Sequence, residues 1–317
     1  EDIKQHIRTD HAMMGYTLFF AVSSIIFWPL SELFRWSALR YAALALLPMM
    51  FLFELSSLMN NLAYDPVLVG AWIISFIILY GILYYHEKIP APYLPFIHIV
   101  SLLLLTCVIT DQISRAIDFY SNWPNTWQYI IWGMVPSLLL FLINQKKVPY
   151  LNRYAYAWGG ILSVFVMAWT LISYFLSGDV YPLPYIPVLN PLELVEGFAL
   201  FSAISWFLNN SDKLSESLDL TKKATFILFS CFIFLFLNTI ILRTLHHWLN
   251  IPYTAVALWH DSSVQTALSI FWMLLALTTT FIAARNHSRI LWFSGFILIG
   301  IVIVKLFFID LSNISSL

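Results

Sequence analysis

The chain has 317 residues, of which 60% are hydrophobic and only 10% are charged, and its mean hydropathy is +0.80. A typical soluble domain is about 45–50% apolar and about 25% charged, so this chain has too little polar surface to cover a core in water. The net charge of −1 leaves no basic surface for nucleic acid. These figures exclude disordered and collagen-like chains and predict an all-α integral membrane protein.

Ten apolar segments are long enough to cross a bilayer, which takes about 17–25 residues of helix. Their continuity excludes a β-barrel, because barrel strands alternate in hydrophobicity over about ten residues. We expect one transmembrane helical bundle over residues 1–317, in which Pro48 and Pro136 kink their helices without ending them. The predicted spans are 12–30, 37–58, 66–85, 92–110, 126–143, 154–176, 191–208, 224–245, 263–284 and 289–309.

The basic residues fall on alternate connections. If the N-terminus lies outside, eleven of the sixteen Lys and Arg residues fall on the inner side. Short inner loops rich in Lys and Arg are the usual mark of the cytoplasmic side. The sequence therefore predicts that both ends of the chain lie outside and that the inner connections are 31–40, 86–91, 144–153, 209–223 and 285–289.

The outer connections 110–127, 177–191 and 243–263 are longer, and they are acidic and aromatic. Their Trp and Tyr residues are typical of the aromatic belt at a membrane interface. The prolines at 182, 184, 187 and 191 exclude a regular helix across 177–191. We expect this connection to be an ordered, extended stretch that lies against the outer face.

Eleven ionisable residues are predicted at one depth near this outer face, and five of them are at the outer ends of the seventh and eighth spans. A short inner loop connects the seventh and eighth predicted spans, so these two helices should be antiparallel neighbours. At the usual packing distance of neighbouring helices, Glu193 or Glu196 should lie within salt-bridge or water-bridged reach of Arg243 or His247. One interpretation is catalytic, with a histidine as base, a carboxylate that orients it and an arginine that holds an anionic head group. The other is an ion pair that only neutralises buried charge. The candidate catalytic residues are His246, His247, Glu193, Glu196 and Arg243.

Further charges lie inside predicted spans, where they usually mark a pathway, a partner or a site. Lys305 is deep enough to require a carboxylate from Glu54, Glu193 or Glu196. These four residues could also form the ion or proton relay of a transporter.

The remaining polar residues and the two cysteines suit structural roles. Asp111, Arg115 and Asp118 suit a solvated helical turn with an i, i+4 ion pair. Asp261 suits a cap for the ninth span, and His98 a hydrogen-bonded core histidine. Cys107 and Cys231 suit small buried hydrophobes.

Motifs for the commoner cofactors are missing from the sequence. It has no GxxxxGK[ST] or GxGxxG loop and no HExxH, GxSxG or paired Cys/His spacing. We therefore predict no cofactor and no metal.

Four stretches carry a resemblance to a known family: PLPYIPVLNPLELVEGFAL (182–200), RTLHHWLNIPY (243–253), SSVQTALSIFWMLLAL (262–277) and SRILWFSGFILIGIVIVKLFFIDLSN (288–313). From about residue 110 onward the chain resembles the bacterial domain-of-unknown-function family numbered twenty-three thirty-nine, known only as predicted membrane proteins. The resemblance implies a bacterial cytoplasmic-membrane location and no established activity. Because members of that family are typically longer, we expect the chain to be the C-terminal part of a longer member.

Three functions remain open on the sequence alone. The first is an enzyme at the outer leaflet that acts on lipid-linked or envelope glycan substrates. The second is a secondary transporter that uses the intramembrane Glu and Lys residues. The third is an envelope scaffold whose outer loops bind a periplasmic protein. All three place the chain among membrane lipids, and none involves nucleic acid.

Overall fold

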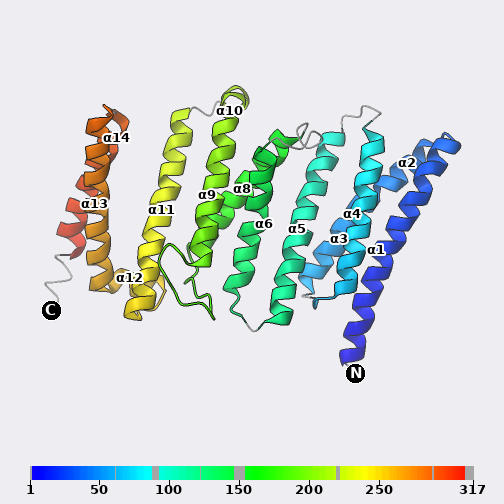
Figure 1. The fold of residues 1–317 in the computed structure, drawn as a ribbon, viewed down its shortest axis with the longest axis horizontal. Helices are drawn as coiled ribbons and strands as arrows, with labels where there is room; N and C mark the ends of the chain where they lie inside the picture. The colour runs from blue at the N-terminus through cyan, green and yellow to red at the C-terminus, as the bar shows by residue number, and fades with distance from the viewer. Residues whose placement is uncertain are drawn as a thin grey trace. The chain divides into compact units, whose positions relative to one another are not determined.

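A computed structural model describes residues 2–60, 62–87, 93–121, 123–145, 154–218, 222–287 and 289–310, and over these it contains helices and no strand (Figure 1). The helices are α1 (Asp2–Leu33), α2 (Ser37–Leu44), α3 (Leu46–Met59), α4 (Pro66–His86), α5 (Leu94–Tyr120), α6 (Thr126–Asn144), α8 (Ala155–Ser173), α9 (Pro191–Asn209), α10 (Ser211–Leu218), α11 (Lys222–Leu249), α12 (Ala255–His260), α13 (Ser262–Arg285) and α14 (Arg289–Lys305), followed by a π-helical turn η1 (Leu306–Asp310).

Within these described ranges, ten helical stretches are long and apolar enough to cross a membrane, which confirms the predicted all-helical fold and number of spans. Most boundaries agree within about three residues. The fourth span is the main exception, because the predicted 92–110 continues as one helix to Tyr120. Its last turns carry Asp111, Arg115 and Asp118, whose charges had suggested an earlier end to the span.

The chain divides into two compact units. Unit 1 comprises residues 1–170 and 198–222, and unit 2 comprises 171–197 and 223–317. The single bundle over the whole chain stays a prediction. Of the predicted inner connections, residues 88–91, 146–153, 219–221 and 288 lie outside the described residues.

Two prolines inside spans of unit 1 have different effects. Pro48 has no N–H to donate to Leu44, and the span is interrupted at Ala45, which separates α2 from α3. The prediction of a kink without a break is therefore wrong at this position. Pro136 lies inside α6, which continues through it to Asn144, as predicted.

Tryptophans and small residues pack the helices of unit 1. The indole of Trp206 on α9 lies directly over Gly159 on α8, and that of Trp169 lies over Gly133 on α6. The indole nitrogen of Trp169 donates to the carbonyl oxygen of Tyr129 at 3.0 Å. Large rings against residues without a side chain let these helices approach closely.

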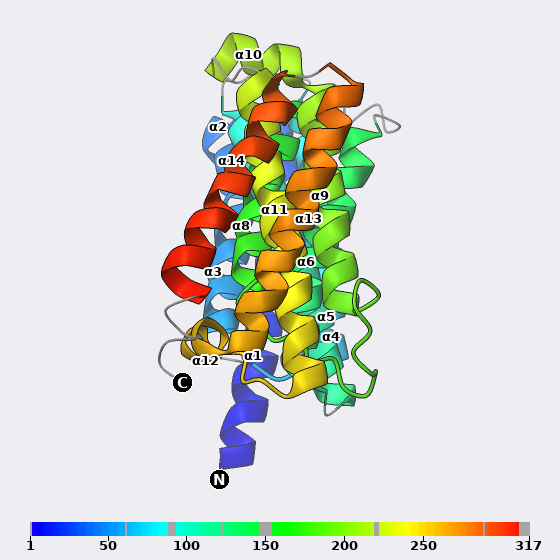
Figure 2. The ribbon, with the colours of Figure 1, turned by 90° about the vertical axis from the view of Figure 1, so that its left-hand side faces the viewer.

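In unit 2, α13 and α14 run side by side as a helical hairpin (Figure 2). Asp261 caps α13, since its side chain accepts from the backbone N–H groups of Ser263 and Val264 at 2.8 and 3.1 Å. This confirms the predicted cap. Both cysteines are free thiols, but Cys231 on α11 is exposed, so its predicted burial is wrong.

Candidate functional site

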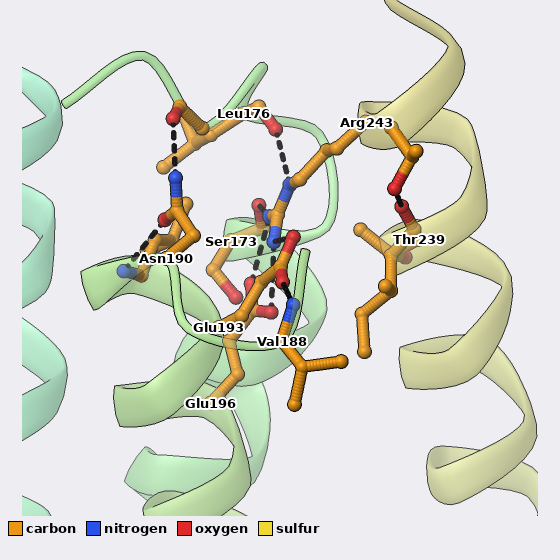
Figure 3. Close-up of polar contacts among 12 residues, drawn as sticks. Ser173, Leu176, Val188, Asn190, Glu193, Glu196, Thr239 and Arg243 are labelled. Atoms are coloured by element: carbon orange, nitrogen blue, oxygen red, sulfur yellow. Dashed lines mark hydrogen bonds and ion pairs between the residues drawn. The ribbon is translucent and has the colours of Figure 1, made fainter. Parts of the chain in front are cut away.

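A buried ion pair joins the first turns of α9 to α11 in unit 2 (Figure 3). The two terminal nitrogens of Arg243 each donate to one carboxylate oxygen of Glu196, at 2.9 and 2.8 Å. Arg243 is fully buried, and so is Glu196. Because the pair is bidentate and shielded from water, it belongs to the strong class of charge-assisted hydrogen bonds.

Arg243 also holds the C-terminal end of α8 and the connection that follows. Its terminal nitrogen Nη2 donates to the carbonyl oxygen of Ser173 at 2.8 Å, and its Nε donates to that of Leu176 at 3.0 Å (Figure 3). The carbonyl of Ser173 is the last of α8 and has no partner within the helix, whereas that of Leu176 belongs to the connection that follows. One guanidinium group therefore ties together α8, α9 and α11 at this end.

The second carboxylate of α9 fixes the proline-rich connection. Glu193 accepts from the hydroxyl of Tyr185 at 2.6 Å and from the backbone N–H of Val188 at 2.6 Å. Its carboxylate lies 4.0 Å from Arg243 and is fully buried. Val188 has a φ of 68°, which is unfavourable for a β-branched residue, and the bond to Glu193 helps to hold it there.

The connection over residues 174–190 is ordered, as predicted, but it consists mostly of turns and not of one extended stretch. Asn190 stabilises both of its ends. Its side chain accepts from the N–H of Leu192 and donates to the carbonyl of Gly178, each at 2.9 Å. Gly178 has a φ of 77°, and a Cβ atom there would lie 3.1 Å from Cδ of Arg243, so only glycine fits without strain.

The two histidines lie at the end of α11, and backbone carbonyls orient both rings. His246 places Nδ1 2.6 Å from the carbonyl oxygen of Ile251, and His247 places Nε2 3.0 Å from that of Ser177. A carbonyl can only accept, so these nitrogens carry hydrogen. In the neutral form of each ring, the acceptor nitrogen is then Nε2 in His246 and Nδ1 in His247. The ring of His247 also stacks on that of Tyr185, with centroids 4.2 Å apart.

A pocket of about 960 Å³ lies beside this cluster in unit 2. Its walls are mostly apolar, with a few polar side chains that include Asn238, Gln265 and Lys305. Tyr174 and Tyr253 line it as well, and the hydroxyl of Tyr253 donates to the carbonyl oxygen of Tyr174 at 2.9 Å. The ring of Tyr253 lies 5.6 Å from that of His246, which places the histidine next to the pocket.

Three tyrosines outside the spans have raised pKa values. Burial raises the pKa of Tyr174 and of Tyr253, and Arg243 partly offsets this effect. Burial also raises the pKa of Tyr185, and the hydrogen bond to Glu193 raises it further. All three side chains are therefore neutral hydroxyls at neutral pH, because even an unperturbed tyrosine has a pKa of about 10.

Lys305 forms no ion pair with Glu193 or Glu196, so the prediction that one of these carboxylates pairs with it is wrong. Its ammonium group donates to the carbonyl oxygen of Gln265 at 2.8 Å and to the hydroxyl of Ser269 at 2.6 Å. It also lies 6.0 Å from the ring centre of Trp272. Neighbouring oxygens and an aromatic face thus stabilise this buried charge.

The charged group of unit 1 is more buried than predicted. Asp111 and Arg115 form the expected i, i+4 pair at 2.6 Å, but their side chains are only 8% and 12% exposed, so the predicted solvation is wrong for this pair, whereas Asp118 is exposed. Arg115 also donates to the backbone carbonyls of Ser57 and Leu62. In the same unit, His98 is fully buried, as predicted, and stacks on Tyr154 at 4.3 Å.

The structure brings together all five predicted site residues, and the predicted proximity of Glu196 and Arg243 is confirmed. Their catalytic roles stay predictions. Sequence reasoning missed Tyr185 and Tyr253, because tyrosines in outer connections were assigned to an interfacial belt. Their positions, eight residues before Glu193 for Tyr185 and six residues after His247 for Tyr253, are the one signal that could have identified them. Among the described residues, no three His, Cys, Asp or Glu side chains are grouped as metal ligands would be.

In the described part of the chain, ten apolar helical stretches with buried charges at helix ends define a multi-pass α-helical membrane protein. The chain belongs to the family described as "Predicted membrane protein (DUF2339)", whose model matches residues 3–317. The match thus includes the first hundred residues, where the sequence offered no motif. No curated protein and no solved structure matches the chain.

Proposed function

We propose that the protein is an enzyme of the bacterial inner membrane that acts, at the periplasmic side, on a lipid-linked or envelope glycan substrate. His246 is the general base of this proposal. Its Nδ1 is held by the carbonyl of Ile251, which leaves Nε2 as a proton acceptor on a ring of fixed orientation. The backbone carbonyl takes the part that a carboxylate takes in many catalytic pairs.

The observation that carries the proposal is the proximity of this base to an apolar pocket. Tyr253 lies against His246 and also lines the 960 Å³ pocket, so an apolar substrate tail in the pocket would bring its head group to the histidine. Ligand sites in proteins typically combine apolar walls with a few placed polar groups. An amphipathic, lipid-linked substrate suits this arrangement.

The other site residues take positioning roles. Arg243 commits four N–H groups to Glu196, Ser173 and Leu176, so we assign it to the scaffold and not to a substrate anion. Glu193 and Glu196 hold the connection and the arginine in place. His247 packs between Tyr185 and Ser177 and supports the ring of His246, 4.6 Å away between centroids.

Activity of the reconstituted protein tests the proposal. The full chain in vesicles is incubated with a polyprenyl-phosphate-linked glycan, and the products are measured by mass spectrometry. His246→Gln should reduce turnover by about 10²–10⁴-fold, the usual contribution of a general base, with unchanged amount and melting temperature. His260→Gln, an exposed histidine of the same unit, should retain full activity. Equal turnover of His246→Gln and wild type, or no turnover by the wild type, refutes the enzyme.

The periplasmic placement rests on the distribution of basic residues and has its own test. A membrane-impermeant thiol reagent is applied to intact cells that carry Ser177→Cys or Ser215→Cys in a background without native cysteines. We expect labelling at position 177 and none at 215. The reverse pattern would place both ends of the chain, and the His246 region, on the cytoplasmic side.

A further inference from the structure

Glu54 on α3 is a buried carboxyl group without a hydrogen bond. Its side chain belongs to a residue that is 3% exposed, and neither of its oxygens has a hydrogen-bond partner among the described residues. One turn further along the helix, at i+3, the hydroxyl oxygen of Ser57 is also buried without a partner. Buried polar atoms are nearly always hydrogen-bonded in native proteins, so the two oxygens of Glu54 are candidates to bind a donor from outside the chain.

Glu54 is the one charged side chain in the wall of an apolar pocket of about 660 Å³ in unit 1. The pocket extends from Leu44 to Leu58 along α2 and α3, about 21 Å at about 1.5 Å per residue. Its other wall is α5, from Phe96 to Cys107. Glu54 lies near the end formed by Leu58. The pocket therefore has the length and the walls for an extended hydrocarbon chain, with one carboxyl group near its end.

The neighbouring arginine does not neutralise Glu54. Arg115 donates to Asp111 and to the carbonyl oxygens of Ser57 and Leu62, which commits its guanidinium group elsewhere. The titratable groups that interact with Glu54 are Asp111, Arg115 and Cys107. Arg115 is thus paired with Asp111, and no cation among the described residues forms an ion pair with Glu54.

We propose that this pocket binds a membrane-soluble molecule with a hydrocarbon chain and a primary amine, and that the amine is bound by Glu54. An ammonium group brings donors and a positive charge, which suits a carboxyl group in the pocket wall whose two oxygens have no partner among the described residues. The shared chemistry fits either a single-chain amine or a phospholipid with an amino head group. This ligand site is separate from the proposed histidine site, since all of its residues belong to unit 1.

Binding of hexadecylamine and hexadecanol to the purified full chain in mild detergent tests the proposal. Both probes have the same chain, so the difference in Kd isolates the amine. We expect the wild type to bind the amine at least tenfold more tightly than the alcohol. Glu54→Gln should remove this preference and leave the alcohol affinity unchanged. Glu32→Gln, a carboxyl on α1 that is 55% exposed, should retain the preference.

A second variant tests whether the hydrocarbon chain of both probes binds in this pocket. Val100→Phe narrows the pocket without changing a charge, and it should weaken both probes equally. Competition by phosphatidylethanolamine would assign the site to a membrane phospholipid, and its absence would assign it to a single-chain amine. Equal affinities of the wild type for amine and alcohol would overturn the proposal, as would a preference that persists in Glu54→Gln.

Discussion

Both units bury carboxyl groups beside an arginine, but only in unit 2 does each of these carboxyl groups accept hydrogen bonds from described residues. In unit 2, Arg243 makes two bonds to Glu196 and two to backbone carbonyls, and Glu193 has its own donors. In unit 1, Arg115 makes one bond to Asp111 and two to backbone carbonyls, and Glu54 has no donor among the described residues. A complete network holds a fold together, whereas an incomplete one indicates where a ligand binds.

The largest expected effect is the loss of the buried pair in unit 2. Glu196→Gln removes the charge that balances Arg243 in a fully buried site, and breaking a buried pair typically costs about 3–5 kcal/mol. The free energy of unfolding, from denaturant titration of the purified protein in mild detergent, measures this loss. Glu32→Gln, which breaks an exposed pair with Arg40, should cost less than about 1 kcal/mol. Equal losses in the two variants would contradict a structural role for Arg243.

A smaller loss is expected for the pair in unit 1. Asp111→Asn leaves Arg115 with its two carbonyl acceptors and keeps a neutral acceptor at position 111. A hydrogen bond to a charged group contributes about 1.5–3 kcal/mol, so the free energy of unfolding should fall by that amount. A loss as large as that of Glu196→Gln would mean that the two sites do not differ in how firmly they hold their charges.

The helices were predictable because hydropathy alone determines which segments can cross a bilayer. The continuation of α5 to Tyr120 was not predictable, because Asp111 and Arg115 place charges at the end of the apolar run. Their i, i+4 ion pair allows the helix to continue through them. The break at Ala45 also escaped prediction. Loss of one backbone hydrogen bond by Pro48 either bends or interrupts a helix, and the neighbouring helices decide which.

The site was predictable as a cluster but not as a network. Depth along each helix follows from residue count, so Glu196 and Arg243 could be placed together. The carbonyls of Ser173, Leu176 and Ser177 could not, because every residue has a carbonyl and the sequence does not mark which of them, at a helix end or in a connection, a side chain will reach. For the same reason, the fixed tautomer of His246 depends on the carbonyl of Ile251, which only a folded turn can position.

A change in the connection that packs against Arg243 should have an effect of intermediate size on the free energy of unfolding. Gly178→Ala should lower the free energy of unfolding by about 1–2 kcal/mol, because a left-handed residue with a Cβ is strained and this Cβ meets the side chain of Arg243. The matched change is Gly197→Ala in α9 of the same unit, where the nearest atom is 3.7 Å away. A helical alanine there should stabilise by about 0.5–1 kcal/mol. Stabilisation by both changes would show that the connection adapts freely and that Arg243 does not fix it.

The smallest expected effect is that of Glu54→Gln. A carboxyl group without a hydrogen bond contributes no pairing energy, and the change to an amide of the same shape removes the cost of burying a charge. The amide still requires partners of its own, which offsets part of this gain. The free energy of unfolding should therefore change by less than about 1 kcal/mol in either direction. A loss of about 3 kcal/mol or more, as for Glu196→Gln, would mean that Glu54 is held by a partner in the folded protein. The difference between the two units would then disappear, and with it the reason to expect a ligand at Glu54.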